Sequence, residues 1–223
     1  MKNRISAARP TSLPRAKRSL GQNFLVDRTF VEKIVAALGP GAGDTVFEIG
    51  PGQGALTRLL VERARKVVAL EFDRELAEHL RKTFADYDNF RLIEDDALRF
   101  DFGEIDAAAG TLRVIANLPY NISTAVLQRL FDHESLLADA VLMFQREVVE
   151  RITAPPSTKD RGYLTVLTEA FFSVERLFDV PPSAFRPVPR IWSSVVRLTP
   201  KRTPPANPDL FRELVARGFA QKR

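Results

Sequence analysis

The chain of 223 residues contains no cysteine, which excludes disulfide bonds, thiolate metal sites and thiol catalysis. It has only two histidines, His79 and His133, and we interpret both as surface or capping residues, so no metal site is predicted. No apolar run is long enough to span a bilayer, and no secretory hydrophobic segment is present. We therefore expect a cytoplasmic protein with no membrane partner and, in addition, a monomer.

Acidic residues are missing from the first 20 positions, where basic residues are frequent. The whole chain has a formal net charge of +5, which fits a polyanionic partner such as nucleic acid. We assign residues 1–18 to a basic, flexible N-terminal arm. The arm is either a solvated tail or a contact for phosphates.

A glycine-rich turn at residues 50–54 follows a short apolar run at residues 45–49 and precedes a helix expected to start near Ala55. This order is typical of the turn that binds a nucleoside or phosphate in a doubly wound α/β sheet. No Lys-Ser/Thr pair follows, which excludes a P-loop. Glu48 would repel a pyrophosphate but can hold an ammonium group. The pattern therefore favours a nucleoside that carries an amino acid, S-adenosylmethionine.

Acidic residues follow the next two predicted strands. The first strand ends at Glu71, which is 71 − 50 = 21 positions after Gly50. This spacing is close to the roughly 20 residues expected before the acid that binds ribose hydroxyls. The second strand leads to Asp95 and Asp96, and either carboxylate could accept a hydrogen bond from the adenine amino group of the cofactor. The pattern alone does not choose between them.

The stretch from Val114 to Ser123 reads VIANLPYNIS, an apolar run that breaks at Pro119 and resumes as a helix. Proline has a fixed φ and no N–H group, so it makes a rigid corner at which the Leu118 carbonyl can point outward. Asn117 adds a side-chain carbonyl, and Tyr120 adds a flat ring. Two acceptors and a stacking platform describe a site for a planar amine such as the amino group of adenine. The alternative is an ordinary turn with an asparagine cap.

These turns meet at the carboxyl edge of one open sheet, which predicts a methyltransferase. We expect an α/β, Rossmann-like class I fold with a seven-stranded, mostly parallel sheet and helices on both faces. The proline-rich segment at residues 180–190 carries Phe185 between basic groups. It either presents an aromatic ring to a base while Arg186 or Arg190 meets phosphate, or is a rigid linker with a core phenylalanine.

The domain organisation follows from a change in composition near residue 200. We assign residues 19–199 to the S-adenosylmethionine-dependent methyltransferase domain. Residues 200–223 are a Pro/Lys/Arg-rich linker and one amphipathic helix, which buries little by itself. We interpret this helix as the first of a truncated C-terminal helical domain.

The sequence resembles the KsgA-type adenine dimethyltransferases of small-subunit ribosomal RNA from about Arg18 to its end. The resemblance rests on Gly21-Gln-Asn-Phe-Leu25, Glu48-Ile-Gly-Pro-Gly52, Asn117-Leu-Pro-Tyr-Asn-Ile-Ser123, Gln145-Arg-Glu-Val148 and Pro181-Pro-Ser-Ala-Phe185. It implies S-adenosylmethionine as the cofactor and the pre-30S ribosomal subunit as the partner. The implied reaction is dimethylation of the exocyclic amino groups of two adjacent adenosines near the 3′ end of small-subunit ribosomal RNA.

The resemblance also implies residue roles. Asp96 becomes the favoured acid of its pair, and the target base would stack on Tyr120 and Phe185. The implied catalytic residues are Asn117, Leu118, Pro119, Tyr120 and Phe185, and the implied cofactor contacts are Asn23, Leu25, Gly50, Glu71, Asp96 and Asn117. The chain departs from the family pattern at Arg161-Gly-Tyr-Leu and at Ile191-Trp192-Ser, where Trp192 replaces a usually small polar residue. The resemblance further implies that most of the helical domain with which the family grips the subunit is missing from this sequence.

Two other functions share this architecture. One is a large-subunit ribosomal RNA adenine methyltransferase of the antibiotic-resistance type, which substrate mapping would distinguish. The other is a non-catalytic ribosome-assembly or mitochondrial transcription factor. Intact Glu71, Asp96 and Asn117-Leu-Pro-Tyr disfavour the loss of catalysis.

Overall fold

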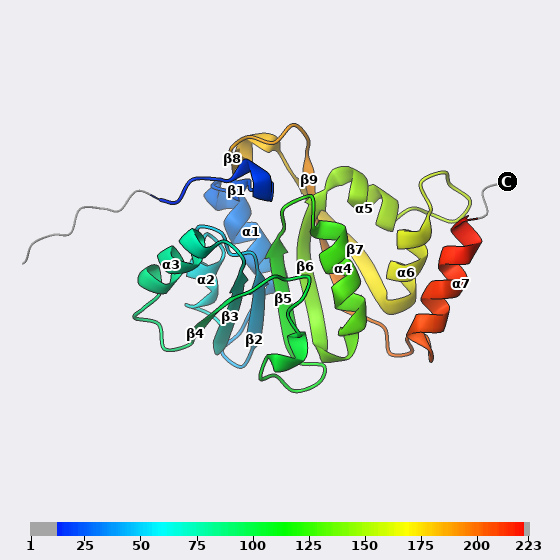
Figure 1. Cartoon of the computed structure of the whole chain (residues 1–223), viewed down its shortest axis with the longest axis horizontal. Coiled ribbons are helices and arrows are strands. Elements are labelled where there is room, and N and C mark those ends of the chain that lie inside the picture. The colour runs from blue at the N-terminus through cyan, green and yellow to red at the C-terminus, as the bar shows by residue number, and fades with distance from the viewer. Residues whose placement is uncertain (1–12, 221–223) are drawn as a thin grey trace, which may run out of the picture.

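The computed structural model describes residues 13–220, so most of the predicted basic arm lies outside the described residues. One seven-stranded sheet has the order β4-β3-β2-β5-β6-β9-β7 (Figure 1). Its strands are β2 (Thr45–Ile49), β3 (Lys66–Glu71), β4 (Phe90–Glu94), β5 (Leu112–Asn117), β6 (Leu137–Gln145), β7 (Phe172–Val180) and β9 (Ser193–Pro200). The strands from β4 to β6 are parallel, and β9 runs antiparallel to β6 and β7. The predicted seven-stranded, mostly parallel sheet is confirmed.

Helices cover both faces of the sheet. The first face packs against α1 (Arg28–Leu38), α2 (Thr57–Leu60) and α3 (Arg74–Thr83). The second packs against α4 (Ser123–Asp132), α5 (Arg146–Ile152) and α6 (Tyr163–Phe171). In β2 the side chain of Val46 joins the first core, and Phe47 joins the second. Burial on both faces explains why these strands read as continuous apolar runs.

The glycine-rich turn is longer than the sequence predicted. The helix expected near Ala55 begins at Thr57 as α2. Gly50, Gly52 and Gly54 all have positive φ angles, at 68°, 58° and 82°, so the chain cannot be helical before this point. A Cβ atom on Gly54 would also lie 2.8 Å from the Phe84 ring. The turn therefore holds glycine both for its backbone and for its close packing on α3.

A small second sheet, absent from the sequence prediction, joins the N-terminal segment to the proline-rich segment. β1 (Phe24–Leu25) pairs antiparallel with β8 (Phe185–Arg186). Short 3-10 helices complete the fold at Arg18–Leu20, Phe102–Glu104, Glu134–Leu136 and Pro182–Ala184. The β1–β8 pair fixes the N-terminal segment beside the carboxyl ends of the parallel strands (Figure 1).

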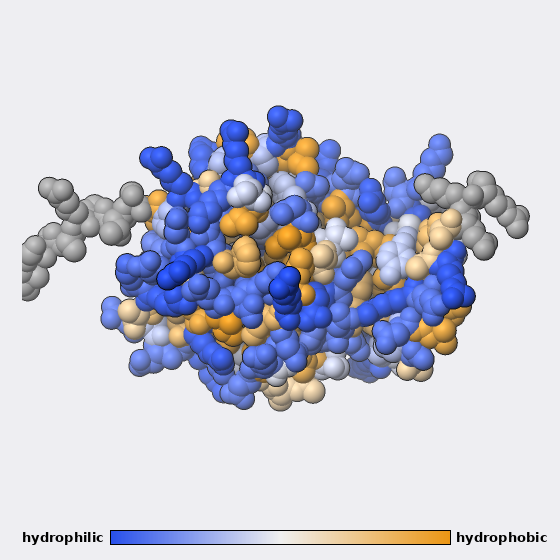
Figure 2. Space-filling model, viewed as in Figure 1, coloured by the Kyte–Doolittle hydropathy of each residue, from blue (hydrophilic) through white to orange (hydrophobic). Residues whose placement is uncertain are grey.

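The last helix, α7 (Pro208–Ala220), packs one side on α6. Phe211 and Val215 contact the second core, and Arg212 forms a 2.5 Å ion pair with Asp132. Its remaining apolar side chains are exposed, namely Leu210, Leu214 and Phe219. Figure 2 shows hydrophilic side chains over most of the visible face, with apolar ones between them. Among residues 13–220, no helix is long and apolar enough to cross a membrane.

An ion-pair cluster joins strands and loops at the amino edge of the sheet. The Arg113 guanidinium pairs with Asp139 at 2.7 Å and with Asp44 at 3.0 Å, and it donates to the carbonyls of Leu38 and Gly39. These partners raise the pKa of Arg113 above its usual value. Only 19% of the side chain is exposed, so its removal leaves two carboxylates poorly compensated.

Replacing Arg113 by methionine is therefore expected to lower the free energy of unfolding by about 2–3 kcal/mol. The affinity for a ligand at the opposite edge of the sheet should not change. Urea unfolding followed by circular dichroism measures the first effect, and calorimetric ligand titration measures the second. An unchanged urea midpoint would show that the cluster adds no net stability.

Candidate functional site

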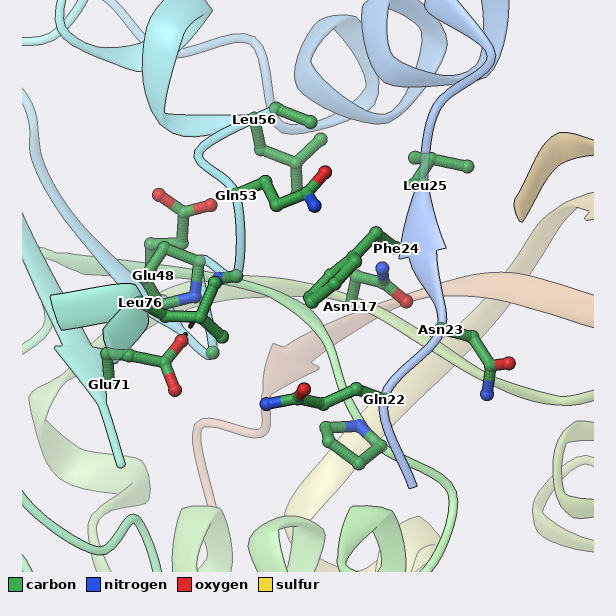
Figure 3. Close-up of a pocket in the computed structure, with 15 residues that line it drawn as sticks. Gln22, Asn23, Phe24, Leu25, Glu48, Gln53, Leu56, Glu71, Leu76 and Asn117 are labelled. Atoms are coloured by element: carbon green, nitrogen blue, oxygen red, sulfur yellow. Dashed lines mark hydrogen bonds between the residues drawn. The ribbon is translucent and has the colours of Figure 1, made fainter. Parts of the chain in front are cut away.

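A pocket opens at the carboxyl edge of the sheet, between the glycine-rich turn and the N-terminal segment (Figure 3). The ends of β2, β3 and β5 form one wall of the pocket, and residues 22–25 form the other. The residues that line it are Gln22, Asn23, Phe24, Leu25, Glu48, Gly50, Pro51, Gly52, Gln53, Ala55, Leu56, Glu71, Leu76, Asn117 and Pro119. We call it the first pocket.

A second pocket adjoins the first, because both are lined by Gln22, Gly50, Glu71 and Pro119. It extends toward the end of β4 and the start of α4. Its further lining residues include Phe72, Asp95, Asp96, Ala97, Leu98, Asn121 and Ile122. The two pockets therefore lie side by side at the carboxyl end of β3, and we refer to them together as one path.

The structure brings all the predicted cofactor contacts to this path. Asn23, Leu25 and Asn117 line the first pocket, Asp96 lines the second, and Gly50 and Glu71 line both. Asp95 also lines the second pocket, so lining alone does not separate the two aspartates. The Asn23 amide points away from the first pocket in Figure 3 and donates to the carbonyl of Gly21 at 3.2 Å.

Two buried carboxylates give the first pocket its electrostatic character. Glu48 is 1% exposed, and its Oε2 accepts a 2.6 Å hydrogen bond from Thr57 Oγ1. Burial, with a contribution from the charge of Glu71, raises the pKa of Glu48 to about 8. Glu71 accepts hydrogen bonds from the N–H groups of Gly52 at 3.1 Å and Asp73 at 2.9 Å, while burial raises its pKa. A cationic ligand would stabilise the ionised form of both groups.

The N-terminal segment contributes contacts that sequence reasoning missed. Lys17 Nζ lies 2.7 Å from Asp73 Oδ1, and the Gln22 amide donates to the other oxygen of Asp73 at 3.2 Å. A Cβ atom on Gly52 would lie 3.1 Å from the Phe24 ring, so glycine allows that ring to reach the turn. Lys17, which belongs to the predicted flexible arm, is therefore attached to the folded domain next to the pocket. The clue in the sequence was Gly21-Gln-Asn-Phe-Leu25, whose glutamine and phenylalanine had no assigned role.

The Asn117-Leu-Pro-Tyr turn begins where β5 ends, with Asn117 opposite Met143 of β6. Among residues 13–220, neither the side-chain amide of Asn117 nor the carbonyl of Leu118 makes a hydrogen bond. Tyr120 is held from two sides: its hydroxyl lies 2.8 Å from Ser193 Oγ, and Ser123 Oγ donates to its carbonyl. Burial raises the pKa of Tyr120 above its ordinary value. The turn thus places Asn117 at the first pocket and Leu118 at the second, while Tyr120 follows them in the chain and lines neither pocket.

Phe185 does not join this group. Its side chain is 1% exposed and belongs to the core between the sheet and α1. It pairs with Leu25 across the β1–β8 sheet and lines neither pocket. This packing fits the interpretation of the proline-rich segment as a rigid linker with a core phenylalanine. Stacking on a base would require the ring to leave that core.

Comparisons with known proteins agree with this geometry. The family described as "Ribosomal RNA adenine dimethylase" matches residues 14–223. The "Ribosomal RNA small subunit methyltransferase A" of Saccharophagus degradans is 46% identical over 212 residues, which cover 94% of this chain and 79% of that protein. The protein of the same name from Thiobacillus denitrificans is 46% identical over 210 residues, covering 93% and 81% of the two chains.

Solved structures give the same picture. A dimethyladenosine transferase from Plasmodium falciparum matches with a TM-score of 0.80 at 32% identity, covering 90% of this chain and 72% of that one. The 23S rRNA methyltransferase ErmE matches with a TM-score of 0.71 at 28% identity, covering 87% and 78%. The predicted resemblance and the Rossmann-like methyltransferase fold are therefore confirmed, and the chain belongs to the ribosomal RNA adenine dimethylase family.

Proposed function

We propose that this protein uses S-adenosylmethionine to dimethylate the exocyclic amino groups of two adjacent adenosines near the 3′ end of small-subunit ribosomal RNA. The observation that carries the proposal is the position of the Asn117-Leu-Pro-Tyr turn, which lies beside the pocket of the glycine-rich turn. Family membership and the relatives named as small-subunit methyltransferases support the same substrate. The protein is accordingly an enzyme.

In this proposal the two pockets would hold different parts of S-adenosylmethionine. Glu48 in the first pocket would attract the ammonium group, and Glu71, which lines both pockets, would accept hydrogen bonds from the ribose hydroxyls. Asp96 in the second pocket would accept from the adenine amino group. When bound, the cofactor supplies an electrophilic methyl group on a sulfonium ion. Carboxylates that line this path complement the positive charge of the ligand.

The chain's own residues would orient the target amine. The Asn117 side-chain carbonyl and the Leu118 carbonyl would each accept one amino hydrogen, which aims the nitrogen lone pair at the methyl group. Such positioning supplies much of the rate when the reacting atoms are held about 3 Å apart. A monomethylated amine still offers one hydrogen to these acceptors, whereas a dimethylated amine offers none. The reaction therefore stops after two methyl groups.

Tyr120 is proposed to stack on the adenine after it leaves its own stack in the RNA. Replacing Tyr120 by alanine should lower turnover at saturating substrate by about 10- to 100-fold, because the amine of the unstacked adenine is then held in line with the methyl group less of the time. Tyr120→Phe keeps the ring and loses only the contact with Ser193, so it should retain most of the activity. Initial rates with both substrates saturating measure the difference. Unchanged turnover in Tyr120→Ala would exclude the stacking role.

The reaction itself is tested with labelled S-adenosylmethionine and under-methylated small ribosomal subunits, followed by mass spectrometry of the RNA. Dimethyladenosine at two adjacent positions near the 3′ end is the expected product. Modification of large-subunit RNA instead would favour the antibiotic-resistance type, which the likeness to ErmE keeps as the second candidate. Cofactor binding without transfer to any RNA would favour a non-catalytic assembly factor. The pre-30S subunit as the partner, action as a monomer and a cytoplasmic location are further parts of this proposal.

A further inference from the structure

A loop of residues 187–192 connects β8 to β9 at the carboxyl edge of the sheet (Figure 1). Its sequence contains both apolar and basic residues. Val188, Ile191 and Trp192 are 57%, 41% and 45% exposed, although all three are large apolar residues. Arg186, the last residue of β8, and Arg190, in the loop, are also exposed, and no acidic residue occurs between residues 181 and 192. An exposed indole among arginines is costly to leave in water, and it suggests a ligand with a planar apolar face and a negative charge.

Hydrogen bonds hold the backbone around Trp192 next to the proposed methyl-transfer site. Its carbonyl accepts a 3.0 Å hydrogen bond from the N–H of Arg146, at the start of α5. The next residue, Ser193, lies opposite Gln145 of β6, and its hydroxyl is 2.8 Å from that of Tyr120. Trp192 therefore directly precedes Ser193, the residue that contacts the proposed stacking ring of Tyr120. Its backbone is fixed while its side chain faces solvent.

The charges around this loop favour an anionic occupant. Arg190 has no ion pair among the described residues, and Arg186 donates only to backbone carbonyls. Arg146 lies 3.4 Å from Glu150, an exposed pair that contributes little and leaves Arg146 available. A single-stranded nucleic acid offers bases for stacking and phosphates for the guanidinium groups. Aromatic rings interleaved with arginines are the usual means of holding such a strand.

We propose that Trp192 stacks on an unpaired nucleobase of the RNA substrate beside the target adenine, with Arg190 contacting the adjoining phosphate. The proposal rests on the proposed function, because it extends the RNA path from Tyr120 across Ser193. Trp192 is then a positioning residue for RNA.

Because Trp192 is the chain's only tryptophan, its fluorescence reports directly on its own environment. Titration with a single-stranded RNA oligonucleotide containing two adjacent adenosines should quench the emission in a saturable manner. S-adenosylhomocysteine alone should leave the emission unchanged. This measurement does not require methyl transfer, so it tests the stacking of Trp192 even if the proposed reaction fails. The proposal would be overturned if the emission did not change on addition of RNA. It would also be overturned if the emission changed with the protein concentration in the absence of RNA.

Kinetics on under-methylated small subunits provide the second test. Trp192→Ala should raise the KM for RNA by about 10-fold with kcat unchanged within about 2-fold, and Trp192→Phe should restore most of the loss. Phe219→Ala is the matched control, because Phe219 is an exposed aromatic residue of α7, outside both pockets. An unchanged KM in Trp192→Ala, with methylation of the expected adenosines intact, would refute the stacking role and leave the proposed function standing. Absence of methylation in the wild-type protein would count against the proposed function.

Discussion

Replacing Asn117 by alanine is expected to slow methyl transfer by about 100- to 1,000-fold at saturating RNA and cofactor. The side-chain carbonyl is one of only two acceptors proposed for the amino hydrogens, and no hydrogen bond to residues 13–220 competes for it. Without it the amine binds in more than one orientation, and its lone pair remains delocalised into the ring. Removal of one preorganised polar group from a transition state has an effect of about this size.

Single-turnover rates measure this loss, and calorimetry with S-adenosylhomocysteine measures cofactor affinity separately. The affinity should fall by no more than about 10-fold, because Glu48, Glu71 and Asp96 remain in place. Asn207→Ala is the matched control, because Asn207 caps the start of α7 and lines neither pocket. A normal single-turnover rate in Asn117→Ala would show that Asn117 does not orient the amine.

The sequence predicted the regular parts of the fold because each strand and helix has its own apolar pattern. The helix predicted to follow the break at Pro119 is α4, since the proline corner before it limits where it can begin. The β1–β8 sheet was not predicted, because two strands of two residues each show no periodicity. Their pairing depends on contacts between distant parts of the chain, which a local pattern does not contain.

Glu71 and Asn117 were selected from the sequence because their residue types suit a chemical role, and both line the first pocket. For Phe185 the residue type does not decide the role, because a phenylalanine in a proline-rich segment is equally suited to stacking at the surface and to packing in a core. Only the pairing of β8 with β1 turns its ring toward α1. Lys17 likewise looked like part of a basic tail, and its ion pair with Asp73 depends on the folded position of α3.

Glu48→Gln is expected to separate stability from cofactor binding. Burial raises the pKa of Glu48 from 4.5 to about 8, so the folded protein retains a proton that the unfolded chain releases between these two values. The free energy of unfolding therefore falls as the pH rises through this window, and it levels off above about pH 8. Glutamine has no proton to release and can still accept the hydrogen bond from Thr57. The variant should be more stable than the wild type by about 2–4 kcal/mol at pH 9.

The effect on the ligand has the opposite sign. An ammonium group stabilises the ionised form of Glu48. The free energy needed to deprotonate Glu48 falls as the pH rises, so the affinity of the wild-type protein for S-adenosylmethionine should rise between pH 6 and pH 8. Glu48→Gln cannot ionise, and it should bind about 10- to 100-fold more weakly at pH 8, as expected for the loss of a charged partner. The pKa of Glu71 is also raised, so a smaller pH dependence should remain in the variant.

Urea unfolding at pH 6 and pH 9, with calorimetric titration of S-adenosylmethionine at pH 6 and pH 8, measures both effects on one pair of proteins. Glu62→Gln is the control, because Glu62 is exposed and lines neither pocket. A variant that is more stable at pH 9 yet binds the cofactor poorly would show that the Glu48 carboxylate lowers the stability of the fold and raises the affinity for the cofactor. A variant that binds as tightly as the wild type at both pH values would require another residue to hold the ammonium group. The carboxylate of Glu71 would then be the one to test, since it lies in the same pocket.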